Sequence, residues 1–308
     1  MPDSVSLADI EAAAARIAGH VRRTPVLADG TLRLKLENLQ VSGSFKARGA
    51  TNKVLTLSEA QRRRGLVTAS GGNHGLGVAA AAQTVGVPAT LYLPESTPAA
   101  KVAKLKKWGA TVVIEGAVWD DANVAALAAA ERDGLTYVHP FADPVVVAAQ
   151  GTIVLEMAAD GPLPDRLVVA IGGGGLIAGV ATAAKALRPD IEIIGVEPFG
   201  APTLHDSRKA GRLITLDRIA TRAGSLAPRR SEQLNLDIVN RHVDDIVLVD
   251  DDEMLAAARE LWFRYGLAVE LSAAAGYAAW AANRIDAGPG ETIGLIICGA
   301  GDDGISQT

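Results

Sequence analysis

The chain has 308 residues, of which 49% are hydrophobic and 21% are charged, values typical of a soluble globular protein of one or two domains. A formal charge of −5 and an aromatic content of 4% argue against nucleic acid or an anionic membrane as the main partner. The single cysteine, Cys298, excludes an intramolecular disulfide and a Cys-rich zinc site.

The N-terminal segment carries early acids and no basic residues before an apolar core, so we predict no signal peptide. No stretch of about 18 apolar residues lacks a charge, and we therefore predict no membrane span. The default expectation is a cytoplasmic protein. The five histidines are dispersed, so a His-based metal site has no support in the sequence.

The predicted elements alternate between helix and strand along most of the chain. Apolar residues at helical spacing predict a helix over Ser6–Val21, and the alternation over residues 32–36 predicts a strand with one buried face. Further strands are predicted at residues 65–69, 88–94, 111–115, 167–171, 191–196 and 292–298. Further helices are predicted after Gly75 as far as Ala82, over residues 99–108, and after Gly175 as far as Ala186. Apolar strands separated by helices indicate parallel sheets covered on both faces, and so an α/β fold.

Lys46 is the first candidate for chemistry. It follows a Ser-Gly-Ser turn, at a point where a helix can begin, and its neighbours Phe45 and Ala47 are apolar. Desolvation lowers the pKa of a lysine, and the neutral amine attacks carbonyl carbon. The functional interpretation is a Schiff-base lysine, and the alternative is a solvated lysine near a helix start.

Two strand-to-helix loops have the composition of anion-binding sites. Ser70–Gly75 follows the strand at 65–69, and backbone N–H groups at such a helix start suit a substrate carboxylate. The alternative there is a tight turn with Asn73 as a cap. Gly172–Gly175 follows the strand at 167–171, and four glycines allow the close backbone approach that a phosphate requires. A plain turn is the alternative at this loop.

Two other features allow different interpretations. Gly173-x-Gly175-x-x-Ala178, with Glu197 at the end of the next strand, fits a dinucleotide-binding pattern and would predict a nicotinamide oxidoreductase. That interpretation leaves the Lys46 and Asn73 segments unexplained. The acidic run 250–253 indicates a helix start with first-turn acids rather than a metal cluster.

In this order, the segments resemble the pyridoxal-phosphate enzymes of the tryptophan-synthase-β type, most closely the threonine/serine dehydratase and serine racemase group. The resemblance extends from Arg23 to Cys298 and includes further segments at residues 35–40, 139–141, 150–152 and 195–198. It implies the two-domain fold type II arrangement, with pyridoxal 5′-phosphate between a large domain (1–64 and 143–308) and a small mobile domain (65–142). Homodimers are common in this group.

The resemblance also implies site residues. Lys46 would form the Schiff base with the cofactor, with Phe45 beside it, and Asn73 would hydrogen-bond the phenolic oxygen of the cofactor. Cys298 stands where the family has Ser or Cys facing the pyridine nitrogen. The cofactor phosphate would be bound by Gly172, Gly173, Gly174, Gly175 and Leu176. The substrate would be bound by Ser70, Gly72, Asn73, His74 and Ser225.

Several positions depart from the family pattern. Serine racemases have a serine where this chain has Gly71, and its absence favours elimination over racemisation. The family metal site uses the acid at Glu197 and a downstream Asp, and Thr203 replaces that Asp, so no metal is predicted. Residues 222–226 and 270–274 also differ, near the substrate in relatives, which leaves the accepted side chain open. Because the chain ends soon after Cys298, we expect no C-terminal regulatory domain of the kind found in biosynthetic threonine deaminases.

The resulting hypothesis is a lyase that deaminates a β-hydroxy amino acid such as L-threonine or L-serine, with Lys46 as the base for the α-proton. A cysteine, whose pKa is about 8.5, cannot hold a proton on the pyridine nitrogen as a carboxylate does, which favours loss of a β-leaving group. The alternatives are β-replacement or racemisation on the same fold, the nicotinamide oxidoreductase, and a non-catalytic cofactor-binding protein.

Overall fold

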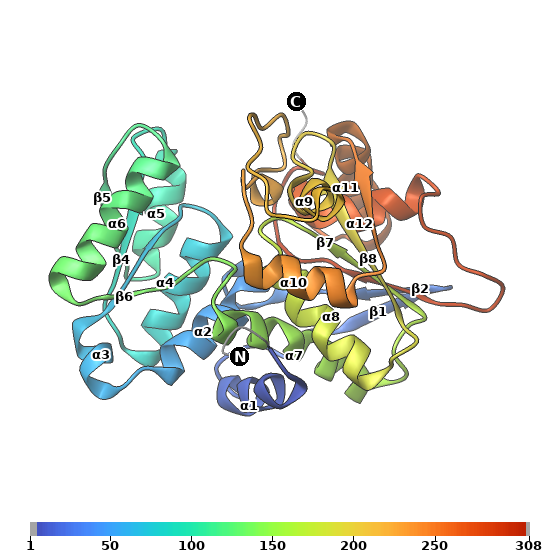
Figure 1. Cartoon of the computed structure of the whole chain (residues 1–308), viewed down its shortest axis with the longest axis horizontal. Coiled ribbons are helices and arrows are strands. Elements are labelled where there is room, and N and C mark those ends of the chain that lie inside the picture. The colour runs from blue at the N-terminus through green and yellow to red at the C-terminus, as the bar shows by residue number, and fades with distance from the viewer. Residues whose placement is uncertain (1–4, 306–308) are drawn as a thin grey trace.

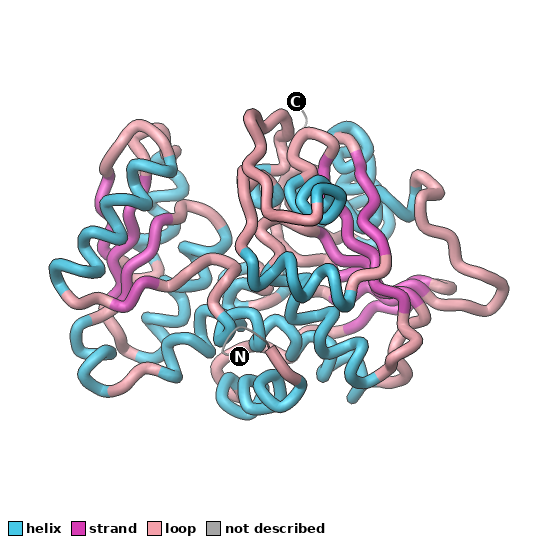
Figure 2. The backbone as a smooth tube through the Cα atoms, in the orientation of Figure 1, coloured by secondary structure: helices cyan, strands magenta, loops and turns pink. Residues whose placement is uncertain are grey.

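The chain folds around two separate β-sheets, which Figures 1 and 2 show side by side. The computed structural model describes residues 5–305. The strands are β1 Val26–Asp29, β2 Leu32–Lys35, β3 Leu66–Ala69, β4 Ala89–Leu93, β5 Thr111–Ile114, β6 Thr136–Tyr137, β7 Arg166–Ala170, β8 Glu192–Pro198, β9 Asp245–Val249 and β10 Ile293–Ile296. The larger sheet has the order β1-β2-β10-β7-β8-β9, and the smaller one has the order β5-β4-β3-β6. Every neighbouring pair is parallel except β1 and β2, which confirms the predicted α/β fold with parallel-rich sheets.

Helices cover both faces of each sheet. They are α1 Leu7–Ile17, α2 Lys46–Thr56, α3 Glu59–Arg64, α4 Asn73–Val85, α5 Ala99–Lys107, α6 Trp119–Asp133, α7 Pro144–Asp160, α8 Gly175–Leu187, α9 Thr203–Ala210, α10 Gln233–His242, α11 Asp251–Tyr265 and α12 Leu271–Ala281. In the larger part, α12 lies against β7 to β10 with α11 outside it, and α8 lies against β7 and packs on α7 and α10. In the smaller part, α4 and α6 contact β3 and β4, and α5 contacts α4.

The helix α2 connects the two parts, because it packs on α4 of the smaller part and on α7 of the larger part (Figure 1). All four strands of the smaller sheet lie within the predicted small domain, residues 65–142. The exact boundaries of the two domains stay a prediction.

The prediction that β2 has one buried face was wrong at Lys35, whose side chain is fully buried. Its ammonium Nζ donates to the Thr24 carbonyl at 2.7 Å and to Glu156 Oε2 at 2.6 Å. A buried charge requires such partners, and Glu156 comes from α7, far along the sequence. Alternation of residue types within one strand carries no information about that partner.

The acidic run behaves as predicted at the start of α11. Asp250 is the N-cap residue, and its side chain accepts the backbone N–H of Glu253 at 2.8 Å. The Glu253 side chain in turn accepts the N–H of Asp250 at 2.8 Å, which completes a capping box. The helix predicted over Ser6–Val21 ends earlier, at Ile17.

Candidate functional site

The loops with the predicted chemistry converge because of the sheet topology. β7 and β10 are parallel neighbours, so the loops at their carboxyl ends, after Ala170 and after Ile296, leave the same edge of the larger sheet. Cys298 lies in the second of these loops, and its backbone carbonyl accepts the N–H of Phe45 at 3.1 Å. The start of α2, with Lys46, is thereby joined directly to the end of β10.

Lys46 is the first residue of α2 and is half-buried. Its ammonium Nζ donates a hydrogen bond to the Pro140 carbonyl at 2.5 Å and lies 5.1 Å from the centroid of the Phe45 ring. Burial lowers the pKa of Lys46 to about 8. A lysine with that pKa has an appreciable neutral fraction near neutral pH, and the neutral amine is the form that attacks a carbonyl.

A buried ionic network holds the first turn of α2. The Arg48 guanidinium donates to both oxygens of Glu37 and to both oxygens of Glu156 at 2.6 to 2.8 Å. Glu156 also binds Lys35, so the two acids and two bases are balanced in charge. The network joins the end of β2, α2 and α7, and it fixes the helix on which Lys46 lies.

The loop after β3 presents the start of α4 to the same region. The backbone N–H groups of Asn73, His74 and Gly75 have no acceptor among the described residues. The Ser70 hydroxyl accepts the N–H of Gly72 at 3.3 Å, within the turn. A helix start with open N–H groups attracts an anion such as a carboxylate.

The first two side chains of α4 point in different directions. The Asn73 amide Nδ2 donates to Glu270 Oε1 at 2.7 Å, so it points toward the larger part. The His74 ring turns the other way: its Nε2 lies 2.9 Å from the Val138 carbonyl and 3.1 Å from Thr68 Oγ1. Burial lowers the pKa of His74 to about 3, so the ring is neutral at pH 7. His74 therefore offers its backbone N–H to a ligand, and the imidazole stays inside the smaller part.

The glycine loop after β7 has the strongest anion-binding geometry of the described residues. From Gly172 to Ile177, the backbone N–H groups have no acceptor in the described chain, and α8 has no side-chain cap. A Cβ added at Gly173 would lie 2.3 Å from the Phe141 ring, and one at Gly175 would lie 2.5 Å from the Phe141 carbonyl oxygen. The loop therefore requires glycine, and its open N–H groups at a helix start suit an anion.

Cys298 and Glu270 complete this group of residues. The Cys298 thiol is buried with Sγ 4.0 Å from the Ser272 carbonyl oxygen, and burial raises the pKa of the thiol, which stays protonated at pH 7. Glu270 is the N-cap residue of α12, and the Ser225 hydroxyl donates to its Oε2 at 3.2 Å. Glu270 was not assigned to the site from the sequence. The available signal was its place in a segment that differs from the family pattern near the substrate.

Comparisons with known proteins agree with this arrangement. The chain matches the family described as "Pyridoxal-phosphate dependent enzyme" over residues 17–299. It belongs to that family. An L-threonine ammonia-lyase of Thermotoga maritima is 39% identical over 97% of this chain and 76% of its own length. Maize serine racemase superposes with a TM-score of 0.92 at 35% identity, covering 96% of this chain and 94% of that one. The tomato (Solanum lycopersicum) threonine deaminase isoform 2, in its processed form, superposes with a TM-score of 0.89 at 33% identity, covering 96% and 83%.

The residues present fit the cofactor of a pyridoxal-phosphate dependent enzyme. Lys46, with its lowered pKa, suits a bond to the aldehyde. The six open N–H groups after β7 suit the phosphate, and the loop lies next to Phe141 and thus next to Pro140, the hydrogen-bond partner of Lys46. Asn73 begins α4, which packs on α2, and the backbone carbonyl of Cys298 accepts the N–H of Phe45, the residue before Lys46.

Family membership overturns the alternative of a nicotinamide oxidoreductase, and Glu197 gives the physical reason. Its carboxylate is buried and accepts the backbone N–H groups of Leu204 and His205 at 2.9 and 2.7 Å. Both of its oxygens therefore hold the start of α9, and the fully buried side chain is not exposed to a ribose hydroxyl. Among residues 5–305, no group of three or more His, Cys, Asp or Glu side chains is placed to hold a metal ion.

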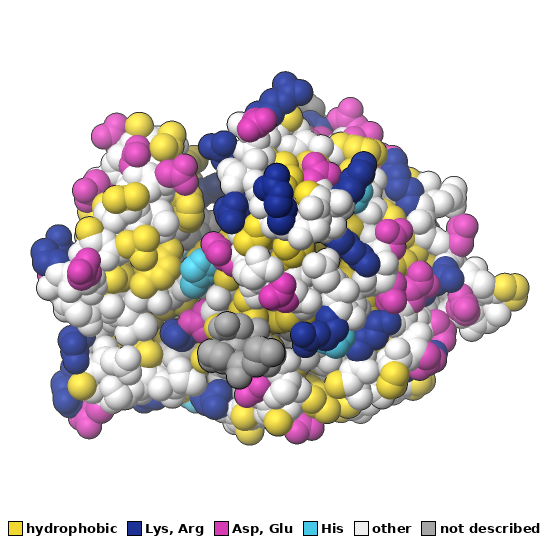
Figure 3. Space-filling view, in the orientation of Figure 1, with side chains coloured by type: hydrophobic (Ala, Val, Ile, Leu, Met, Phe, Trp, Pro, Cys, Tyr) yellow, Lys and Arg dark blue, Asp and Glu magenta, His cyan; other side chains and the backbone are white. Residues whose placement is uncertain are grey.

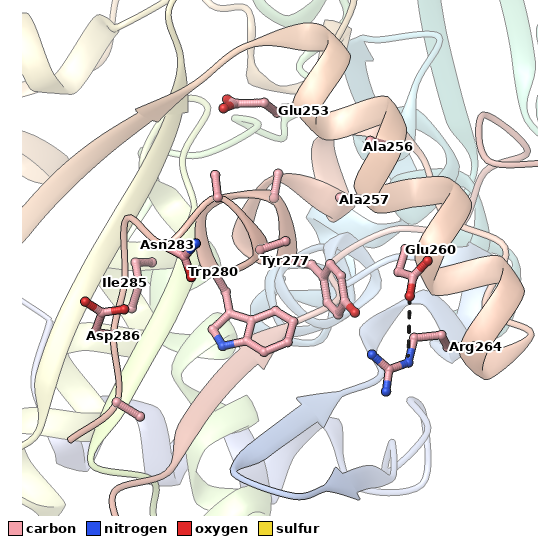
Figure 4. Close-up of a pocket in the computed structure, with 14 residues that line it drawn as sticks. Glu253, Ala256, Ala257, Glu260, Arg264, Tyr277, Trp280, Asn283, Ile285 and Asp286 are labelled. Atoms are coloured by element: carbon pink, nitrogen blue, oxygen red, sulfur yellow. Dashed lines mark ion pairs between the residues drawn. The ribbon is translucent and has the colours of Figure 1, made fainter. Parts of the chain in front are cut away.

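A separate cavity of about 610 Å³ lies between α11 and the end of α12, where Tyr277 and Trp280 face Glu260 and Arg264 (Figure 4). None of the predicted site residues lines it. On the face of the molecule drawn in Figure 3, acidic and basic side chains are interspersed rather than gathered by sign. Within the described residues, no helix is both long enough and apolar enough to cross a bilayer.

Proposed function

We propose that this pyridoxal-phosphate dependent enzyme is an ammonia-lyase that converts a β-hydroxy amino acid, L-threonine or L-serine, to a 2-oxo acid and ammonia. The observation that carries the proposal is Lys46, a half-buried amine with its pKa lowered to about 8, on a helix that packs on α4. Its Nζ donates to the Pro140 carbonyl, next to Phe141, which lies against the glycine loop before α8. Relatives at 39% identity over nearly the whole chain are named as threonine ammonia-lyases.

The cofactor, when bound, supplies an electron sink that acidifies the Cα–H bond of the substrate. Lys46 would serve as the base that takes the α-proton, and the β-hydroxyl would leave with one proton as water. The enamine that is released then takes up one water molecule, which gives the 2-oxo acid and ammonia. The N–H groups of Asn73, His74 and Gly75 would bind the substrate carboxylate, and those of Gly172–Ile177 would hold the cofactor phosphate. Cys298, a neutral buried thiol, would offer no negative charge to the pyridine nitrogen, which would favour loss of the leaving group.

The glycine at position 71 disfavours racemisation of the substrate. A second acid–base group on the opposite face of the substrate would have to come from this position, and glycine carries none. Thr97 and Leu93 lie 3.3 and 3.4 Å from where a Cβ at Gly71 would be, so a serine would fit only with a small shift of these side chains.

The test is a panel of amino acids assayed for release of 2-oxo acid and ammonia by the purified protein. We expect L-threonine or L-serine to give both products in equal amounts, and Lys46→Ala to lose both the turnover and the visible absorbance of the cofactor. Rapid cysteine formation from O-acetylserine and sulfide, with little oxo acid, would indicate β-replacement instead. Accumulation of the D-amino acid would indicate a racemase. The absence of turnover on the whole panel would indicate a non-catalytic protein.

We further propose a cytoplasmic homodimer that acts on a small amino acid and has no nucleic acid or membrane partner. The division into a large domain and a small domain at residues 65–142 is part of the same proposal, because closure of the α4 start onto Lys46 would exclude water during the reaction. Sedimentation of the purified protein at two concentrations would measure the oligomeric state.

A further inference from the structure

Asn235 lies outside every motif found in the sequence, yet it contacts the phosphate loop. It is fully buried on α10, and its amide Nδ2 donates to the Gly173 carbonyl at 2.7 Å and to the Phe141 carbonyl at 3.0 Å. The Ser231 hydroxyl, also buried, donates to the same Gly173 carbonyl at 2.9 Å. The reverse orientation of the Asn235 amide would place Oδ1 against two carbonyl oxygens, so the donor assignment is fixed by its partners.

These contacts set the direction of one peptide in the loop. The trans peptide is planar, so its C=O and N–H groups point in opposite directions. Because Asn235 and Ser231 draw the Gly173 carbonyl toward α10, the N–H of Gly174 points away from α10, toward the open side of the loop. Gly173 and Gly174 have no side chains that would resist a rotation of this peptide, and Gly174 already has a φ of +91°.

We propose that Asn235 and Ser231 are positioning residues that keep the Gly173–Gly174 peptide from flipping, so that its N–H group rather than its carbonyl oxygen faces the cofactor phosphate. This inference rests on the proposed cofactor site and extends it to α10, a helix with no other part in that site. Asn235 also ties the loop to Phe141, the residue after the Pro140 carbonyl that binds Lys46. Asn235 therefore holds the glycine loop in a fixed position relative to the segment that binds Lys46.

The experiment compares pyridoxal 5′-phosphate with pyridoxal, which lacks the phosphate, by titrating each into the cofactor-free enzyme and following visible absorbance. Asn235→Ala should weaken pyridoxal phosphate binding about tenfold or more, because a loop carbonyl loses its donor and the peptide can flip. Its affinity for pyridoxal should change much less. Asn240→Ala is the matched control, since Asn240 is exposed on the same helix. It should change neither affinity.

Ser231→Ala gives a second, milder variant that keeps the Asn235 contacts, and it should shift the same ratio in the same direction. Equal weakening of both ligands in both variants would indicate a role in folding alone and would overturn the inference. Unchanged affinities in both variants would overturn it as well. A wild-type protein that fails to bind pyridoxal phosphate would instead reject the proposed function itself.

Discussion

The carboxylate of Glu270 accepts a hydrogen bond from the Asn73 amide at 2.7 Å, joining two residues that are 197 positions apart. Asn73 begins α4 beside the smaller sheet, and Glu270 caps α12 beside the larger sheet. An added Cβ at Gly299 would lie 2.7 Å from the same carboxylate, so the end of β10 also approaches it closely. Glu270 is thus a point at which both parts of the molecule meet at the site.

Glu270→Gln should change how stability depends on pH. Burial raises the pKa of Glu270 to about 7 from an ordinary 4.5. Between these values the folded protein keeps a proton that the unfolded chain releases, so the wild type loses stability as pH rises through this window. The variant lacks that loss, and the difference should reach about 1–3 kcal/mol above pH 7. Urea unfolding of the cofactor-free proteins at pH 5 and pH 7.5 measures this difference. The same change in the free energy of unfolding between the two pH values in both proteins would contradict the prediction.

Lys46→Met should abolish turnover and stabilise the cofactor-free protein at pH 7. The pKa of Lys46 falls from 10.5 to about 8 on folding, so the cost of burying the ammonium is present in full below pH 8 and disappears above 10.5. Methionine keeps the apolar stem without the charge. We expect a gain of about 1–3 kcal/mol at pH 7 that is much smaller at pH 10, measured by urea unfolding at both values. An equal gain at both values would mean that the charge is not its cause.

Arg48→Met should destabilise the protein strongly, because it leaves the carboxylates of Glu37 and Glu156 buried with only Lys35 to balance them. Removing one partner of a buried ion pair costs about 3–5 kcal/mol. Arg23→Met is the matched control: Arg23 pairs with Asp160 at the surface, and exposed pairs contribute little. Thermal unfolding of both variants tests the contrast, and similar melting temperatures would contradict it.

Much of the fold could be predicted because strands and loops carry local signals. Short apolar runs at 65–69, 88–94 and 167–171 predict the strands that the structure has at 66–69, 89–93 and 166–170, and small residues predict the two glycine-containing loops. The long helix Pro144–Asp160 was not predicted, although Asp143 at its N-cap and Pro144 at its first position are a recognisable start. Its apolar residues lie on all sides, so it lacks the periodicity that reveals a surface helix.

The site was harder to predict where it depends on distant partners. Motifs single out Lys46, Asn73 and Cys298, but the proximity of these residues depends on the order of strands in two sheets. Asn235 and Glu270 have no motif, and each is defined by what it contacts: a glycine carbonyl 62 residues away and an amide 197 residues away. A hydrogen bond of this kind leaves no periodic pattern in either segment.

Gly77→Ala should harm the site through packing. The new Cβ would lie 3.0 Å from the Lys46 carbonyl carbon and oxygen, and backbone atoms cannot move aside as the end of a side chain can. Overpacking of this kind costs about 1–3 kcal/mol, more than the helix propensity that alanine gains. Gly276→Ala in α12 is the control, since its Cβ would meet Val168 at an ordinary 3.4 Å and should leave stability equal or higher. The measurements are the cofactor affinity and the unfolding midpoint of both variants, and equal values for the two variants would contradict the prediction.

Inorganic phosphate should stabilise the cofactor-free protein by binding the loop at the start of α8. The open N–H groups from Gly172 to Ile177 bind it only in the folded state, and a ligand at a hundredfold its dissociation constant adds about 2.7 kcal/mol. Chloride at matched ionic strength controls for screening of surface charges. Gly174→Ala should remove the effect, because φ is +91° there and the new Cβ would lie 2.6 Å from Leu204 Cδ1, so the loop must rearrange. If phosphate raises the melting temperature of this variant as much as that of the wild type, the ion binds elsewhere and the loop is not the phosphate site.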